Sequence, residues 1–100
     1  MKLFNIKKLR NKLFDTLKKI YIGDGLYLEV EDVKIWFLNY SEDEDAYEPT
    51  YEIKISYGRF NEDNKDNNNF DREVSLIDIE AKDGYDFICG MFYQYLVTNE

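Results

Sequence analysis

The sequence predicts an α+β fold in which a helix at each end of the chain packs on a four-stranded antiparallel sheet, in the order α-β-β-β-β-α. Three observations lead to this prediction: apolar residues recur at helical spacing near both ends, alternating stretches fill the middle, and most connections are short. Two amphipathic helices need an apolar surface, and one face of a sheet supplies it. One hundred residues correspond to a single domain, 1–100.

The first helix is expected over residues 2–21, ended by the turn Gly23-Asp24-Gly25. Its apolar residues fall in one arc: Leu3, Ile6, Leu9, Leu13, Leu17 and Ile20. Several lysines occupy the opposite arc, so the helix is expected to dock on the sheet with its basic side in water. Contact of this basic side with a partner or with a membrane surface is the alternative.

The four strands are expected over residues 26–31, 33–40, 50–58 and 73–80. Apolar and polar residues alternate in 26–31, and Glu31-Asp32 is interpreted as a tight turn into the next strand. Residues 33–40 are apolar on both faces, which is typical of a central strand or of one whose second face meets something else. Residues 50–58 alternate cleanly, which indicates a half-buried strand.

The expected fourth strand contains a break in its alternation. Val74 and Leu76 point one way while Ile77 and Ile79 point the other, which predicts a β-bulge.

The last helix is expected from about Gly84 to Val97, with Asp83 as its N-cap and Asp86 in the position of a capping box. Its apolar residues share one stripe and are expected to face the sheet. They are Phe87, Ile88, Met91, Phe92, Tyr95 and Leu96.

The residue types present argue against most catalytic and cofactor chemistry. The chain has no histidine and no glycine-rich phosphate loop, and its one cysteine, Cys89, can form no internal disulfide and is expected to be a buried structural thiol. A two-carboxylate hydrolase would need a buried acid, which loop-borne carboxylates rarely provide. We therefore expect no enzyme, no catalytic residue and no cofactor.

The one candidate metal site in the sequence is a calcium loop. Glu62, Asn64, Asp66 and Glu73 occupy suitable ligand positions, but the sixth position holds Asn67 where such a loop requires glycine. A solvated loop is the preferred interpretation.

The charge is polarised along the chain. The net charge is −8, yet residues 1–22 carry seven basic side chains against Asp15 alone. The acids concentrate in two expected loops, around residues 42–48 and 62–73. Because phosphate binding depends on Lys and Arg, an acidic body disfavours direct binding of nucleic acid. No apolar run is long enough to span a bilayer and no secretory signal is recognisable, so a cytoplasmic location without membrane attachment is expected.

The acidic loops and nearby aromatic residues are the candidate site. Carboxylates can imitate the phosphates of nucleic acid and pair with Arg and Lys on a target, while aromatic rings provide anchors. The candidate partner-binding residues are Glu42, Asp43, Glu44, Asp45, Tyr47, Glu48, Glu62, Asp63, Asp66, Asp71, Trp36 and Tyr40.

In size, acidity, composition typical of AT-rich genomes and lack of catalytic groups, the chain resembles the small acidic inhibitors that phages encode against bacterial defence systems, such as anti-CRISPR and anti-restriction proteins. The resemblance is one of general character and implies no role for any single residue. The leading hypothesis is a non-enzymatic inhibitor that occupies the basic surface of a nucleic-acid-binding protein or nuclease. The alternative is an immunity-type or regulatory module that binds one protein partner through an aromatic sheet face, notably Trp36.

Overall fold

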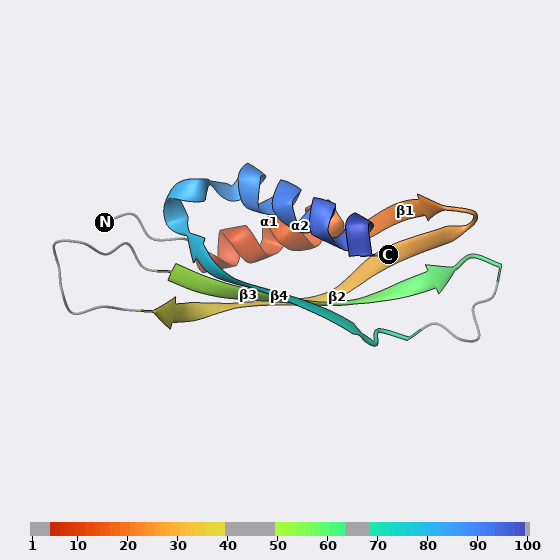
Figure 1. The fold of residues 1–100 in the computed structure, drawn as a ribbon, viewed down its shortest axis with the longest axis horizontal. Helices are drawn as coiled ribbons and strands as arrows, with labels where there is room; N and C mark the ends of the chain where they lie inside the picture. The colour runs from red at the N-terminus through yellow and green to blue at the C-terminus, as the bar shows by residue number, and fades with distance from the viewer. Residues whose placement is uncertain (1–4, 40–49, 64–68, 100) are drawn as a thin grey trace, which may run out of the picture.

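The computed structural model describes residues 5–39, 50–63 and 69–99, and it confirms the α+β fold and the α-β-β-β-β-α order. Figure 1 shows the helices lying above the curled sheet. The elements are α1 (Ile6–Leu17), β1 (Lys19–Gly23), β2 (Leu26–Asn39), β3 (Thr50–Asn61), β4 (Arg72–Glu80), the 3-10 turn η2 (Ala81–Asp83) and α2 (Tyr85–Asn99).

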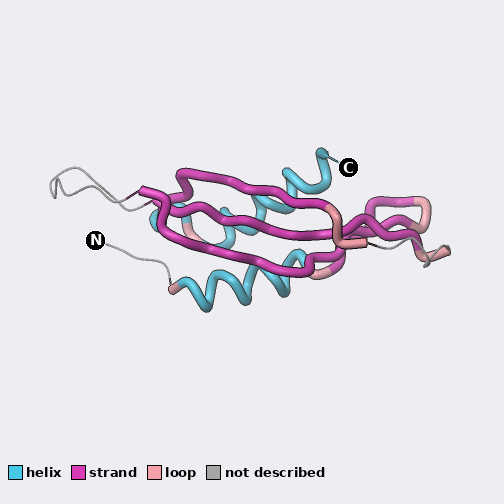
Figure 2. Tube along the Cα trace, turned by 90° about the horizontal axis from the view of Figure 1, so that it is seen from below, coloured by secondary structure: helices cyan, strands magenta, loops and turns pink. Residues whose placement is uncertain are grey.

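The strands follow one another in the sheet, in the order β1-β2-β3-β4, and every neighbouring pair is antiparallel. Both helices lie on the same side of the sheet and run in the same direction, so the other side carries neither of the described helices (Figures 1 and 2). We call that side the helix-free face. At about 3.3 Å per residue, the 14 residues of β2 extend over roughly 46 Å, which accounts for most of the 55 Å length of the molecule.

The first helix is shorter than expected, because residues 19–23 form β1. Ile20 fits the helical spacing of α1, but it also alternates with Lys19 and Tyr21 as in a strand. Pairing with β2, which sets Ile20 opposite Leu28, settles the choice, since it supplies hydrogen-bond partners and keeps Ile20 only 4% exposed. Gly23-Asp24-Gly25 is the turn of this hairpin, and all three residues have positive φ.

The expected turn at Glu31-Asp32 was wrong, and the two strands predicted around it form the single strand β2. Glu31-Asp32 lacks the glycine of a tight hairpin turn, and the chain continues through a β-bulge, in which Glu31 and Asp32 share the position opposite Ser56. The Asp32 carboxylate accepts a hydrogen bond from the backbone N–H of Val33 (2.9 Å). The sheet still has four strands, because residues 19–23 add one strand and the two strands predicted around Glu31-Asp32 form a single one.

The predicted bulge in the fourth strand is confirmed. The pairing of β3 with β4 shifts between Tyr51 and Ile53, and Asp78 takes a positive φ of 59° within it. The extra residue returns Ile79 to the core, where it is 5% exposed, and leaves Ile77 58% exposed. Val74 and Ile79 therefore share the helix-covered face, contrary to the simple alternation.

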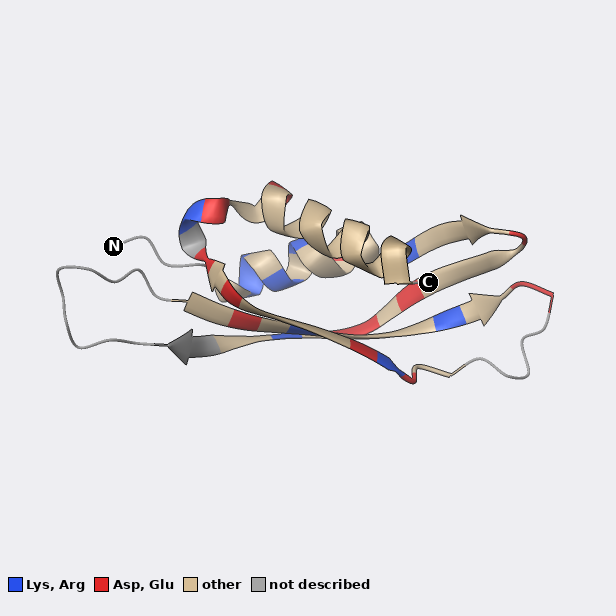
Figure 3. Cartoon of the chain, viewed as in Figure 1, with Lys and Arg blue, Asp and Glu red and all other residues tan. Residues whose placement is uncertain are grey.

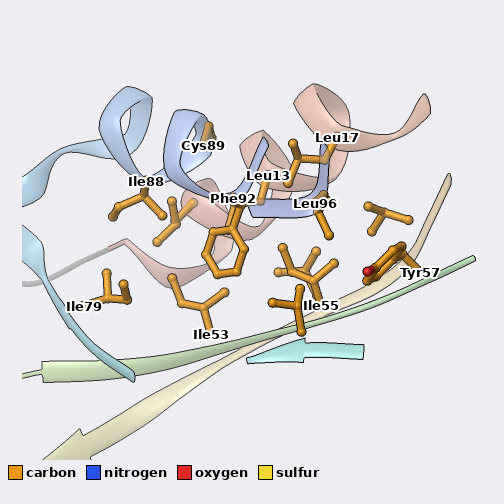
Figure 4. Packing of buried hydrophobic residues seen from close by; sticks show 14 of the residues in the cluster. Leu13, Leu17, Ile53, Ile55, Tyr57, Ile79, Ile88, Cys89, Phe92 and Leu96 are labelled. Carbon is orange, nitrogen blue, oxygen red and sulfur yellow. The ribbon is translucent and has the colours of Figure 1, made fainter. Parts of the chain in front are cut away.

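The core lies between the helices and the sheet. In Figure 4, Phe92 points from α2 towards Ile53 and Ile55 of β3, and all three side chains are fully buried. Burial of such a side chain is worth about 1.5–3 kcal/mol relative to exposure. Cys89 belongs to the same cluster, as expected, and burial raises the pKa of its thiol.

The two helix starts differ in their capping. The Asn5 side chain caps α1 by accepting a hydrogen bond from the backbone N–H of Lys8 (3.1 Å). Asp83 was expected to cap α2, but its carboxylate instead accepts from the backbone N–H of Glu80 (3.2 Å), within the 3-10 turn that precedes the helix.

The expected apolar stripe of α2 is divided between the core and the outside. Ile88, Phe92 and Leu96 are buried. Phe87 and Tyr95 are 61% and 41% exposed, so the prediction that they face the sheet was wrong. The sheet is narrow, and α1 already covers part of it, so it can bury only one side of a helix that is apolar on most sides.

Candidate interaction site

The turn at the end of β3 lies beside the β1–β2 hairpin. The backbone N–H of Glu62 donates a hydrogen bond to the carbonyl oxygen of Gly25 (2.8 Å), which joins the two turns. The Asn61 side chain accepts from the backbone N–H of Asp63 (2.8 Å) and so fixes the bend that follows β3. These contacts place Glu62 and Asp63 next to the Gly-Asp-Gly turn.

Three carboxylates gather at this end of the sheet, and we call Asp24, Glu62 and Asp63 the acidic end. All three are exposed. In Figure 3 the turns at this end are coloured as acidic, whereas the basic residues concentrate on α1. The Asp63 carboxylate lies close to Gly25, where an added Cβ would come within 3.6 Å of it.

A row of aromatic rings crosses the sheet beside the acidic end. The ring centroids of Tyr21 and Tyr27 are 6.0 Å apart, those of Tyr27 and Phe60 5.5 Å, and those of Phe60 and Phe70 4.9 Å, with the last pair perpendicular. Strand pairing explains the row, because Tyr21 lies opposite Tyr27 and Tyr27 lies opposite Phe60. The outer members are exposed, Tyr21 by 61% and Phe70 by 43%, and are available as anchors.

Lys19 is the cation associated with this row. Its ammonium lies 4.4 Å from the ring centre of Tyr27 and 5.1 Å from that of Tyr21, within the range of a cation–π interaction. The pKa of Lys19 is raised, mainly by a hydrogen bond with Tyr21 and then by the electrostatic influence of that residue, Tyr27 and Glu62, which together outweigh desolvation. Lys19 therefore stays charged, and its positive charge partly offsets the negative charge of the acidic end.

The middle of the helix-free face carries a polar network around Trp36. Lys54 lies 6.0 Å from the Trp36 ring centre and forms an ion pair with Glu73 (3.3 Å). Next to it, the Ser75 hydroxyl donates a hydrogen bond to Glu52 (2.6 Å). Trp36 is 36% exposed, and the charges around it are of both signs.

Four of the predicted site residues lie in the described part of the chain, and eight lie outside it. Glu62, Asp63 and Asp71 are exposed, with Asp71 in an ion pair with Arg72 (3.0 Å), while Trp36 stands apart on the helix-free face. The remaining predicted residues lie outside the described residues: Tyr40, Glu42, Asp43, Glu44, Asp45, Tyr47, Glu48 and Asp66. Three positions of the candidate calcium loop, Asn64, Asp66 and Asn67, also lie outside them.

Asp24 was missed by the sequence reasoning. In the sequence it stands only as the middle residue of the turn Gly23-Asp24-Gly25. A signal was available, because residues that follow one strand and those that precede its antiparallel neighbour lie at the same end of a sheet. Applied to β2 and β3, this rule places the turn before β2 next to the residues after β3.

Metal-ligand clusters and buried charged groups are both absent from the described parts of the chain. Within residues 5–39, 50–63 and 69–99, no group of three or more Cys, Asp or Glu side chains is arranged to hold a metal ion. No Asp, Glu, Lys or Arg in these ranges is buried. Neither of the two helices described is long and apolar enough to cross a membrane.

No family model, curated protein or solved structure matches this chain. The function must therefore be inferred from the chemistry of the exposed surfaces, because a fold alone does not determine what a protein does.

Proposed function

We propose that this chain is a non-enzymatic inhibitor that binds the basic, nucleic-acid-binding surface of another protein through its acidic residues. One observation supports this most: Glu62 and Asp63 come together with Asp24 beside the exposed rings of Tyr21 and Phe70. Carboxylates recognise Arg and Lys, and aromatic anchors next to them provide apolar contact.

The charge balance favours a protein partner over nucleic acid. The chain carries a net charge of −8, which repels phosphate at long range. The same charge attracts a basic surface and speeds its encounter, and this attraction weakens with salt. The exposed carboxylates lack the burial that a general acid needs, which supports a binding role over a catalytic one.

The first experiment identifies the partner. The purified chain serves as bait in lysate of its native host, and bound proteins are eluted in steps of rising salt and identified. Elution of a nucleic-acid-binding protein or nuclease at moderate salt, with added DNA or RNA competing for it, is the expected result. A partner that resists high salt and ignores nucleic acid would contradict the proposal.

The second experiment tests the acidic end against that partner. The double variant Glu62→Lys/Asp63→Lys should weaken binding by at least about tenfold, because two attractive contacts become repulsive. The matched control Asp15→Lys/Glu31→Lys changes the net charge equally, on α1 and in the middle of β2. If both double variants weaken binding to the same extent, only overall charge matters and the acidic end is not the site.

A second candidate function is recognition of one partner through the helix-free face. The exposed Trp36 ring, held beside Lys54, favours it, because Trp is frequent at the centres of interfaces. Such a complex should survive high salt and fail on Trp36→Ala. Since Trp36 is the only tryptophan, its fluorescence reports directly whether a partner covers it.

A further inference from the structure

The outer side of α2 is an apolar surface that none of the described elements covers. Phe87 and Tyr95 are 61% and 41% exposed, and Met91 between them is partly buried. A shallow groove runs along this side, lined by Phe87, Gly90, Met91, Gln94, Tyr95 and Thr98, with Asp86 and Asn99 at its two ends. We call it the α2 groove.

Gly90 lies in the middle of the α2 groove, and the packing of a single copy does not require a glycine there. A Cβ added at Gly90 would meet nothing within 4 Å, and the residue is exposed. Glycine inside a helix is unfavourable relative to alanine, so a monomer alone would be better served by alanine. A surface that approaches the backbone closely at this point would account for the glycine.

The α2 groove carries a single charged group, the carboxylate of Asp86 at its end, although the chain as a whole is strongly acidic. The only charged residue of α2 is Asp86, and its carboxylate forms an ion pair with Lys12 of α1 (2.6 Å). Two copies with a net charge of −8 each repel one another over most of their surfaces. The α2 groove, whose one carboxylate is paired with Lys12, is where they can meet with the least repulsion.

The groove also matches itself under a two-fold rotation. Phe87 and Tyr95 stand four residues before and after Met91, which lies close to the middle of the 15-residue helix. An axis near Met91 sets two α2 helices antiparallel and brings Phe87 of one copy against Tyr95 of the partner subunit. The antiparallel arrangement also brings the positive end of each helix dipole to the negative end of the other.

From these observations we infer that the α2 groove is the interface of a homodimer, with Gly90 at the closest approach of the two helices. At about 200 Å² for a full aromatic side chain, the exposed parts of Phe87 and Tyr95 supply roughly 400 Å² across two copies. This area is well below the roughly 1,200 Å² at which stable specific interfaces begin, so the dimer is expected to be weak. A reversible dimer with a dissociation constant on the order of 10–100 µM is expected.

Sedimentation equilibrium at concentrations from about 1 µM to about 1 mM tests the dimer, since this range brackets the expected dissociation constant. The apparent mass should rise from one copy towards two. Gly90→Glu should raise the dissociation constant by at least about tenfold, because it puts a charge at the closest contact. Tyr93→Glu is the matched control on the same helix, as Tyr93 is 45% exposed and does not line the groove; it should change the constant less than about threefold.

Crosslinking provides a second readout that does not depend on Gly90→Glu folding. In a Cys89→Ser background, Met91→Cys should form a disulfide-linked dimer under mild oxidation, while Tyr93→Cys should remain a monomer. A mass of one copy at every concentration, or equal effects of the groove and control variants, would overturn the inference. Either result would leave the proposed binding of a basic partner untouched, because that proposal concerns other residues.

Discussion

Gly58→Ala should destabilise the protein, although replacing glycine in a strand ordinarily stabilises it. Gly58 lies in β3 under the Phe60 ring, and a Cβ there would come within 2.5 Å of the Asn69 carbonyl oxygen and 2.8 Å of the Phe60 ring. Both distances are shorter than real contacts allow. The ring can turn aside, but the carbonyl belongs to the backbone, so the segment at Asn69 has to move away.

The expected magnitude follows from two opposing effects. Overpacking of this kind costs about 1–3 kcal/mol, and the lower chain entropy of alanine in the unfolded state returns about 0.4–1 kcal/mol. The midpoints of these two ranges leave a net loss of about 1–2 kcal/mol. For a domain of this size, 1 kcal/mol corresponds to roughly 4–8 °C, so the melting temperature should fall by about 4–16 °C.

Gly90→Ala is the matched control, because the same substitution there meets no atom within 4 Å. It should raise the stability of the monomer by about 0.5–1 kcal/mol. Urea unfolding followed by circular dichroism and Trp36 fluorescence, at a concentration where the chain is monomeric, measures both variants. If Gly58→Ala is as stable as the wild type or more so, the close approach of Asn69 and Phe60 to Gly58 is refuted.

Three further predictions concern the core and its edge. Phe92→Ala should lower the free energy of unfolding by about 3–5 kcal/mol in urea titrations, because the ring is fully buried. A loss of less than about 1 kcal/mol would mean that the ring is not in the core. Cys89 should react with a thiol reagent at least about tenfold more slowly in the native protein than in denaturant, since burial raises its pKa; equal rates would contradict its placement. Lys12 lowers the pKa of Asp86 from its ordinary 3.8, so their pairing stabilises the fold above that value and is lost as the pH falls through the lower native value. The melting temperatures of the wild type and Asp86→Asn should therefore converge between about pH 5 and about pH 2, and a constant difference would show that the pair is not responsible.

The sequence by itself determined the features that depend on local periodicity. The spacing of Leu9, Leu13 and Leu17 defines the buried side of α1, and all three are fully buried. The alternation in residues 50–58 predicted which residues of β3 enter the core. The broken alternation around Ile77 predicted the bulge in β4, because side chains of a strand must alternate unless a residue is added.

Only the tertiary structure decided features that depend on partners distant in the sequence. Residues 19–23 satisfy both a helical and a strand pattern, and pairing with β2 made them a strand. The continuity of β2 through Glu31-Asp32 likewise depends on hydrogen bonds to β3. The acidic end exists because Asp24 and Glu62 are brought together by the antiparallel arrangement of the strands, although 38 positions separate them in the sequence.

The apolar stripe of α2 is split between buried and exposed residues, and the sequence alone does not determine where the split falls. A stripe of apolar residues predicts that a helix has a side to bury, but not how much of it the sheet can cover. Here Phe92 enters the core while Phe87, on the same helix, stays 61% exposed. Burial depends on the area available between α1 and the edge of the sheet, and that area is set only when all the elements have packed.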